Sequence, residues 1–251
     1  HEEFFGPILH VLSYKDAELE KTIDQLNSKG FGLTFGIHSR IEKKVKDISL
    51  RVNAGNIYIN RNQIGAVVGS QPFGGEGLSG TGPKAGGPNS LHGYSQNILF
   101  RERSNHKMLF SDHPIVAREL LPSSLQLSNE LLLKLKRAFP NIEEDFFEFL
   151  YQEVLKYSSD IFLPGPTGES NQLIYKPKGT VLCLGPEPDE LLKQTLLSLF
   201  LGNSVICPIS SKDCNIIIEL GFKKENILRL NDSPSMSLLV SNLYSAVFYS
   251  G

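Results

Sequence analysis

A glycine-rich stretch from Gln63 to Pro88 places the strongest constraint on how this chain folds. It carries nine glycines within QIGAVVGSQPFGGEGLSGTGPKAGGP. Glycine is used where the backbone takes positive φ or approaches another group closely. A flexible linker is the alternative, but a solvated linker would not contain so many apolar residues. These residues are Ile64, Val67, Val68, Phe73 and Leu78. The stretch is therefore predicted to pack around a ligand or a second chain.

An alternation of strands and helices precedes this stretch. Strands are predicted at 8–14, 31–39 and 56–60, and helices at 17–29 and 41–55. Asp16 is expected to cap the first helix and Gly30 to end it, while Ile41, Val45, Ile48 and Val52 form the buried face of the second. The pattern predicts an α/β domain with a largely parallel sheet. Ligands bind at the carboxyl ends of such strands, which is where the glycine-rich stretch begins.

The second half of the chain has a different organisation. Residues 114–157 are predicted to be helical, with a break at Pro140 and a helix cap at Asn141. A strand is also expected at NILF, residues 97–100. Further on, strands at 180–184, 204–210, 226–230 and 245–250 enclose helical segments, which predicts a second α/β module.

Four motifs resemble those of aldehyde dehydrogenases. They are EFFGP at residues 3–7, FGLTFGIHSR at 31–40, GNIYINR at 55–61 and PFGG at 72–75. Within that superfamily, the glycine-rich stretch is similar to the end of the glutamate-semialdehyde (1-pyrroline-5-carboxylate) dehydrogenase domain of the proline utilization A family. Members of that family are bifunctional, with an FAD-dependent proline dehydrogenase and an NAD-dependent aldehyde dehydrogenase. The resemblance covers about the first hundred residues.

The resemblance implies roles for five residues. Glu3 would bind the hydroxyl groups of the nicotinamide ribose of NAD, and Phe5 would pack beside the nicotinamide ring. Gly65 and Ala66 would donate backbone N–H groups to the α-carboxylate of the semialdehyde substrate. Phe73 would pack on the aliphatic part of the substrate. For each residue a purely structural role is the alternative: core packing for the two aromatic rings, and a solvated surface position for Glu3.

The family's chemistry also needs a cysteine nucleophile and a glutamate that activates water, and both precede the EFFGP motif. Cys183 and Cys207 lie in strand-like apolar runs and are predicted to be buried core residues; Cys214 begins the apolar run NIIIEL. No residue of the chain is therefore predicted to be catalytic or to bind a metal. The chain is expected to be a piece of a longer polypeptide and inactive alone.

The segment LPGPTGESN, residues 163–171, and the strand that follows resemble the C-terminal domain of longer family members. The expected fold class is α/β, with an aldehyde-dehydrogenase-like parallel sheet fragment, a helical linker and a second Rossmann-like α/β module. The expected domains are 1–104, 105–160 and 161–251. The turn LGPEPDELL lacks a glycine-rich fingerprint and carries acids, so no dinucleotide is expected there.

Composition sets the remaining expectations. A formal net charge of −2 leaves no basic footprint for nucleic acid. There is no apolar run of transmembrane length, and three cysteines without CxxC spacing fit a reducing compartment. We expect the longer protein to be a cytoplasmic homo-oligomer. Its flavin domain could also associate with the membrane surface. The alternative function is a non-catalytic assembly module with an aldehyde-dehydrogenase-like outline.

Overall fold

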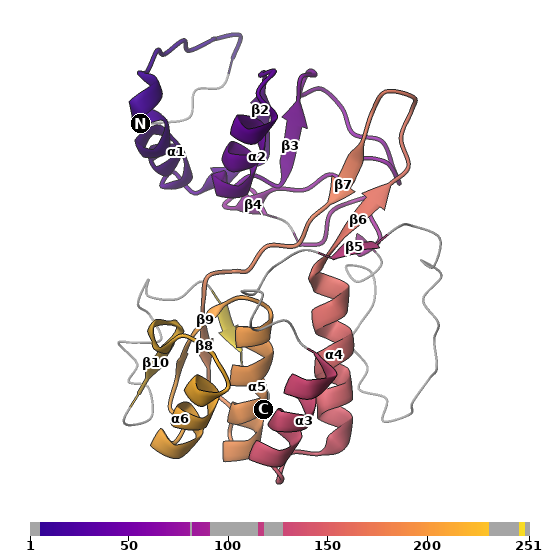
Figure 1. The fold of residues 1–251 in the computed structure, drawn as a ribbon. Coiled ribbons are helices and arrows are strands. Elements are labelled where there is room, and N and C mark those ends of the chain that lie inside the picture. The colour runs from indigo at the N-terminus through magenta and orange to yellow at the C-terminus, as the bar shows by residue number, and fades with distance from the viewer. Residues whose placement is uncertain (1–5, 81, 91–114, 118–127, 231–245, 249–251) are drawn as a thin grey trace. The chain divides into compact units, whose positions relative to one another are not determined.

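The computed structural model of the chain describes residues 6–80, 82–90, 115–117, 128–230 and 246–248 (Figure 1). These residues form two compact units. The first unit holds the described part of His1–Met108 together with Leu163–Asn171. The second unit holds the described parts of Leu109–Phe162 and Gln172–Gly251. Both are mixed α/β structures with a small parallel sheet.

The first unit is built around one strand–helix–strand crossover. Its elements are the 3-10 helix η1 (Asp16–Glu18), α1 (Leu19–Asn27), β1 (Phe31–Gly32), β2 (Thr34–Ile37), α2 (Glu42–Arg51), β3 (Asn56–Ile59) and β4 (Glu76–Gly77). Strands β2 and β3 pair in parallel with Thr34 opposite Asn56, while β1 and β4 pair antiparallel. The predicted parallel pairing of the second and third strands is confirmed.

Helices α1 and α2, strand β2 and the segment between α2 and β3 form the small apolar core of this unit. The buried core residues are Ile23, Ile37, Ile48, Val52 and Ala54. Gly30 ends the first helical segment at φ 75°, as predicted, because this backbone conformation strains any residue with a Cβ. Ile41 was predicted to lie on the buried face of α2, but it precedes the helix as its N-cap and is 62% exposed.

Two further predictions for this unit are wrong. Residues 8–14 form no strand, because no strand of the described chain supplies hydrogen bonds to them. Their side chains are mostly exposed, up to 90% at Leu12. Asp16 does not cap α1 but lies in η1, and its carboxylate forms an ion pair with Lys44 at 2.5 Å.

The second unit has a parallel sheet and a small antiparallel one. Its elements are β5 (Ile115–Ala117), α3 (Asn129–Ala138), α4 (Glu144–Tyr157), β6 (Ser159–Leu163), β7 (Asn171–Leu173), β8 (Thr180–Cys183), α5 (Pro188–Phe200), β9 (Ser204–Cys207), α6 (Ser211–Glu219), the 3-10 helix η4 (Lys224–Asn226), β10 (Ile227–Arg229) and β11 (Ala246–Phe248). The parallel sheet has the order β10-β9-β8-β11. The other sheet has the order β5-β6-β7, with β5 antiparallel to β6.

Helix α5 is the centre of the second core. Leu196, Leu199 and Phe200 of this helix are at most 1% exposed, and residues of α3, α4, α6, β8, β9 and β10 belong to the same cluster. A turn at Gly202, with φ 83°, leads from α5 to β9. The side-chain oxygen of the next residue, Asn203, accepts hydrogen bonds from the backbone N–H groups of Lys178 and Gly179 at 2.7 and 3.2 Å. This amide joins the starts of β8 and β9.

The predicted helical region 114–157 is corrected in two places. Residues 115–117 form strand β5, because β6 offers them backbone partners that the periodicity of the sequence does not reveal. The N-cap position of α4 is Glu143, whose side chain makes no capping hydrogen bond, and Asn141 lies in the turn after α3. The break at Pro140 is confirmed. The strand expected at 97–100 lies outside the described residues.

Candidate functional site

The candidate site lies on the segment that follows β3. We call residues 62–70 the anchor loop. The chain turns into it at Asn60, a non-glycine residue with φ 56°. The Asn60 side-chain amide donates to the Ser39 carbonyl at 3.0 Å and accepts from the Ser39 N–H at 2.9 Å. These two bonds fix the carboxyl ends of β2 and β3 against each other, so the loop starts from a defined position.

Gly65 and Ala66 lie at the exposed part of this loop. Gly65 has φ 81°, and within the described structure no hydrogen bond is made by the N–H group of Gly65 or of Ala66. The Gly65 carbonyl faces the protein and accepts a hydrogen bond from the hydroxyl group of Tyr58 at 3.2 Å. Tyr58 is only 6% exposed. The loop is thus held through a carbonyl while two neighbouring donors stay available, which is what binding of a carboxylate requires. Their predicted role remains a prediction.

Phe73 lies where the glycine-rich stretch folds back on itself. Its backbone exchanges two hydrogen bonds with Ala85, at 3.0 and 2.9 Å, in an isolated antiparallel bridge. Its ring is 36% exposed, so it is not a fully buried core residue. The exposed part of this ring is an apolar surface that a ligand could contact. The contact of Phe73 with the substrate remains a prediction.

Asn56 and Lys84 hold the PFGG motif in place, and sequence reasoning missed both. Asn56 donates to the Pro72 carbonyl at 2.8 Å and accepts from the Gly74 N–H at 3.1 Å. The Lys84 ammonium donates to the Gly74 carbonyl at 2.8 Å and also to the Gly55 carbonyl. For Lys84 the sequence did hold a signal, since it is the one basic residue in the glycine-rich stretch.

The environment of Lys84 changes its titration. Burial lowers the pKa of its ammonium, and the nearby Glu76 carboxylate opposes this change only in part. The packing is close here, because a Cβ atom on Gly55 would collide with the Gly74 carbonyl. A partly desolvated cation that donates to two backbone carbonyls acts as a structural clamp for the motif.

A third set of residues joins the anchor loop to the distant segment Leu163–Asn171. The Glu169 carboxylate accepts a hydrogen bond from the Arg61 guanidinium at 3.0 Å and one from the Gln71 amide at 3.0 Å. All three residues belong to the first unit. Sequence analysis could not find this contact, because Arg61 and Glu169 are 108 residues apart.

The two residues assigned to NAD by resemblance cannot be placed. Glu3 and Phe5 both lie outside the described residues. The described part of the first unit therefore offers no test of how a dinucleotide would fit, and the NAD contacts remain predictions.

The buried cysteines are inert core residues, as predicted. Cys183 and Cys207 are both fully buried. Burial raises the pKa of Cys183 to about 12, although a contact with the Ser198 hydroxyl opposes the change, and burial raises the pKa of Cys207 as well. Thiolate is the nucleophilic form, so burial disfavours nucleophilic chemistry at both side chains. Cys214, in the first turn of α6, is half-buried against the same core.

The turn between β8 and α5 carries acids where a dinucleotide would place phosphates. Glu187 is the N-cap of α5, and Asp189 and Glu190 lie in its first turn. A Cβ atom on Gly185 would collide with the backbone nitrogen of Leu191, so this glycine serves close packing of the turn. The negative charges disfavour pyrophosphate at this helix end. That no dinucleotide binds here stays a prediction.

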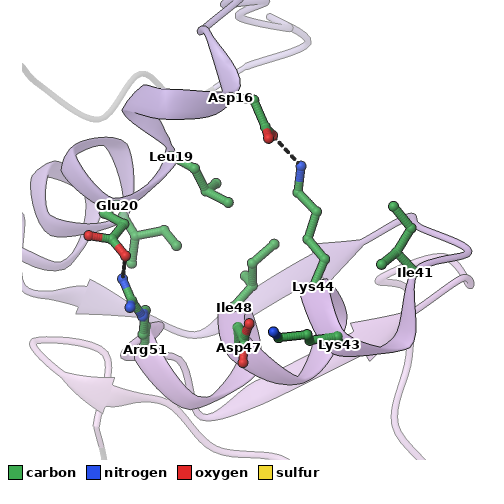
Figure 2. A pocket seen from close by; sticks show the side chains of 10 residues that line it. Asp16, Leu19, Glu20, Ile41, Lys43, Lys44, Asp47, Ile48 and Arg51 are labelled. Carbon is green, nitrogen blue, oxygen red and sulfur yellow. Dashed lines mark hydrogen bonds and ion pairs between the residues drawn. The ribbon is translucent and has the colours of Figure 1, made fainter.

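A cavity of about 260 Å³ lies between α1 and α2 (Figure 2). None of the predicted site residues lines it. Its charged rim is closed by the ion pair between Asp16 and Lys44 and by a second pair between Glu20 and Arg51 at 2.6 Å. Lys43 and Asp47 also line the cavity, so charges of both signs surround it.

The described residues were also considered as ligands of a metal ion and as membrane-spanning helices. Within them, no group of three or more His, Cys, Asp or Glu side chains is arranged to hold a metal ion. Among the helices that the structure describes, none is both long and apolar enough to cross a membrane.

Comparison with known proteins shows which proteins the chain resembles. Residues 1–98 match the model of the aldehyde dehydrogenase family. The bifunctional protein PutA of Klebsiella aerogenes is 34% identical over 254 aligned residues, which cover 100% of this chain and 19% of that protein. The mitochondrial delta-1-pyrroline-5-carboxylate dehydrogenase of Homo sapiens is 39% identical over 43% of this chain and 19% of that protein.

A solved structure gives the highest identity among these comparisons but covers little of the chain. The D779W mutant of Bradyrhizobium japonicum PutA is 61% identical over 36% of this chain and 9% of that chain, with a TM-score of 0.35. The chain thus spans about a fifth of the length of the curated relatives it matches. Residues 1–98 match the aldehyde dehydrogenase family, and the chain is similar over its full length to the PutA of Klebsiella aerogenes.

Proposed function

We propose that the chain is part of an NAD-dependent glutamate semialdehyde (1-pyrroline-5-carboxylate) dehydrogenase within a bifunctional enzyme of proline catabolism. The observation that carries the proposal is the anchor loop, in which two adjacent N–H donors, those of Gly65 and Ala66, are exposed and make no hydrogen bond within the described structure. The names of the relatives agree, since they include both bifunctional PutA and 1-pyrroline-5-carboxylate dehydrogenases.

The proposed site binds the carboxylate end of the substrate. Two neighbouring N–H groups form an anion-binding concavity that costs no side-chain entropy on binding. The half-exposed ring of Phe73 then covers the aliphatic part of the substrate. Together these contacts direct the aldehyde carbon away from the loop, toward a cysteine nucleophile and a general-base glutamate supplied by other parts of the protein.

The remaining roles follow from the same resemblance. Glu3 and Phe5 contact NAD when it is bound, and NAD supplies the hydride acceptor. FAD serves a separate proline dehydrogenase domain. We assign residues 1–104 to the aldehyde dehydrogenase domain, 105–160 to a linker that contains α3 and α4 as well as strand β5, and 161–251 to a degenerate Rossmann-like domain that acts as a lid and in assembly, with its segment Leu163–Asn171 packed into the first unit. The chain alone is inactive, and the parent enzyme is a cytoplasmic homo-oligomer.

One observation favours a second candidate, a non-catalytic assembly module. Both fully buried cysteines are held as thiols, so neither serves as the nucleophile that an aldehyde dehydrogenase needs. The two candidates differ in whether a reactive cysteine precedes His1 in the full-length protein. Labelling the native protein with iodoacetamide and mapping the modified peptide decides between them.

The substrate assignment is tested with Ala66→Asp in the full-length protein. A carboxylate at this position repels the substrate carboxylate by about 1 kcal/mol when fully hydrated and about 4 kcal/mol when partly desolvated. We expect the KM for glutamate semialdehyde to rise at least about fivefold, while proline oxidation is unchanged. Ala66→Asn, which adds similar volume without charge, separates repulsion from steric effects. Ala17→Asp, on exposed η1, is the matched control. An unchanged KM for Ala66→Asp removes the anchor loop from the substrate site.

A further inference from the structure

The anchor loop has few contacts of its own to hold its shape. Ile64, Val67 and Val68 are 82%, 57% and 84% exposed, so apolar packing contributes little to its conformation. Inside the loop, the N–H group of Ile64 donates to the Asn62 side chain at 3.1 Å. Near its end, the Gly69 N–H donates to the Gly86 carbonyl at 2.8 Å. A loop that binds a carboxylate with fixed donors needs further support.

Glu169 supplies that support from a distant part of the chain. One oxygen of its carboxylate accepts from Arg61, which directly precedes the loop, and the other accepts from Gln71, which directly follows it. A carboxylate can only accept hydrogen bonds, so the amide nitrogen of Gln71 must face it. The side chains of Arg61 and Glu169 are 29% and 33% exposed, which leaves the pair partly shielded from water. One side chain therefore joins both ends of the loop.

The same network reaches the predicted donor site. The Arg61 guanidinium lies over the ring of Tyr58, 5.3 Å from its centroid. The Tyr58 hydroxyl donates to the carbonyl of Gly65. Fixing the Arg61 guanidinium through Glu169 therefore fixes it over the ring whose hydroxyl orients the Gly65–Ala66 peptide. A displacement at Glu169 would be transmitted through only two intervening side chains to this peptide unit, which carries the Ala66 N–H group, and from there to the adjoining Gly65 backbone.

We infer that Glu169 is a positioning residue for the carboxylate-binding loop, acting through Arg61, Gln71 and Tyr58. It sets the direction of the Gly65 and Ala66 N–H groups and thereby favours aldehydes that carry a carboxylate over those that do not. This inference rests on the proposed function, because it assigns a support to the same substrate site. It also gives the loop Leu163–Asn171, which lies far along the chain, a role in substrate selection.

The kinetic test compares two aldehydes in the full-length enzyme. For Glu169→Ala we expect the KM for glutamate semialdehyde to rise about tenfold, the scale of losing a charge-assisted hydrogen bond, while kcat changes less than about twofold. The KM for propionaldehyde, which has no carboxylate, is expected to stay unchanged. Glu169→Gln keeps an acceptor for Arg61 and should fall between wild type and Glu169→Ala. Glu20→Ala, which breaks the exposed pair with Arg51, is the control.

Equal changes for both aldehydes, or no change for either, would overturn the inference. A second measurement does not depend on activity. Hydrogen exchange of peptides covering residues 62–71 is expected to accelerate in Glu169→Ala and not in Glu20→Ala, and unchanged exchange also contradicts the inference. If the wild-type enzyme does not oxidise the semialdehyde, the proposed function fails, and accelerated exchange then still establishes Glu169 as the support of the loop.

Discussion

Lys84→Met removes the clamp on the PFGG motif while keeping the length of the side-chain stem. The ammonium donates to two backbone carbonyls, those of Gly55 and Gly74, and lies 3.5 Å from the side-chain oxygen of Asn56. Each charge-assisted hydrogen bond contributes about 1.5–3 kcal/mol, and the desolvation that lowers the Lys84 pKa offsets part of the sum. We expect a net loss of about 2 kcal/mol in the free energy of opening this segment.

Native-state hydrogen exchange measures that loss directly. The N–H groups of Phe73 and Ala85 are bonded to each other's carbonyls and report opening of the segment. A change of about 2 kcal/mol accelerates their exchange about thirtyfold. Lys44→Met is the control, because its ion pair with Asp16 is exposed on the Asp16 side and is screened by water. Exchange rates in Lys84→Met that stay within about twofold of wild type would refute the reasoning.

The difference in stability between wild type and Lys84→Met should change with pH in one direction, which follows from the Lys84 pKa. Burial lowers the folded-state pKa of Lys84 below 10.5, so the unfolded chain holds more protons in the interval between the two values. Wild type should therefore gain stability relative to Lys84→Met as the pH rises through that interval. If the stability advantage of wild type over Lys84→Met shrinks as the pH rises, burial does not lower the Lys84 pKa.

Two more predictions concern the second unit. Leu196→Ala, at a fully buried site in α5, should lower the free energy of unfolding by about 2–5 kcal/mol, while Leu133→Ala, at a site 53% exposed, should change it by less than about 1 kcal/mol in denaturant titrations. Cys183 should resist thiol reagents in the folded protein at pH 8, because burial raises its pKa from the ordinary value of 9.0 to about 12. For the same reason the free energy of unfolding should fall as the pH rises above 9.0, since the unfolded chain then loses the thiol proton first. Rapid labelling, or a free energy of unfolding that does not fall, would contradict the burial of Cys183.

The sequence predicted elements whose stability depends on local pattern. Ile48 and Val52 lie at helical spacing, and their burial follows from it. Gly30 and Gly202 mark helix ends because only glycine takes their backbone angles without strain. The parallel pairings of β2 with β3 and of β8 with β9 follow from the strand–helix–strand order.

The elements that were missed depend on distant partners. Residues 8–14 have the composition of a strand, yet a strand also needs a neighbour that offers hydrogen bonds. Strand β5 exists because β6 pairs with it, which no local periodicity reveals. Within the candidate site, Gly65 and Ala66 were identified through a family motif, and their role in binding the substrate stays a prediction. The contacts of Lys84 with Gly74 and of Glu169 with Arg61 required the folded structure.

The position of Glu169 also has a consequence for how the protein is made. Gln71 and Glu169 are 98 residues apart, and ribosomes add about 5–20 residues per second. About 5–20 seconds of synthesis therefore separate the anchor loop from the carboxylate that joins its ends. During this interval the loop emerges without its support, and the first unit completes its assembly only after part of the second has been translated.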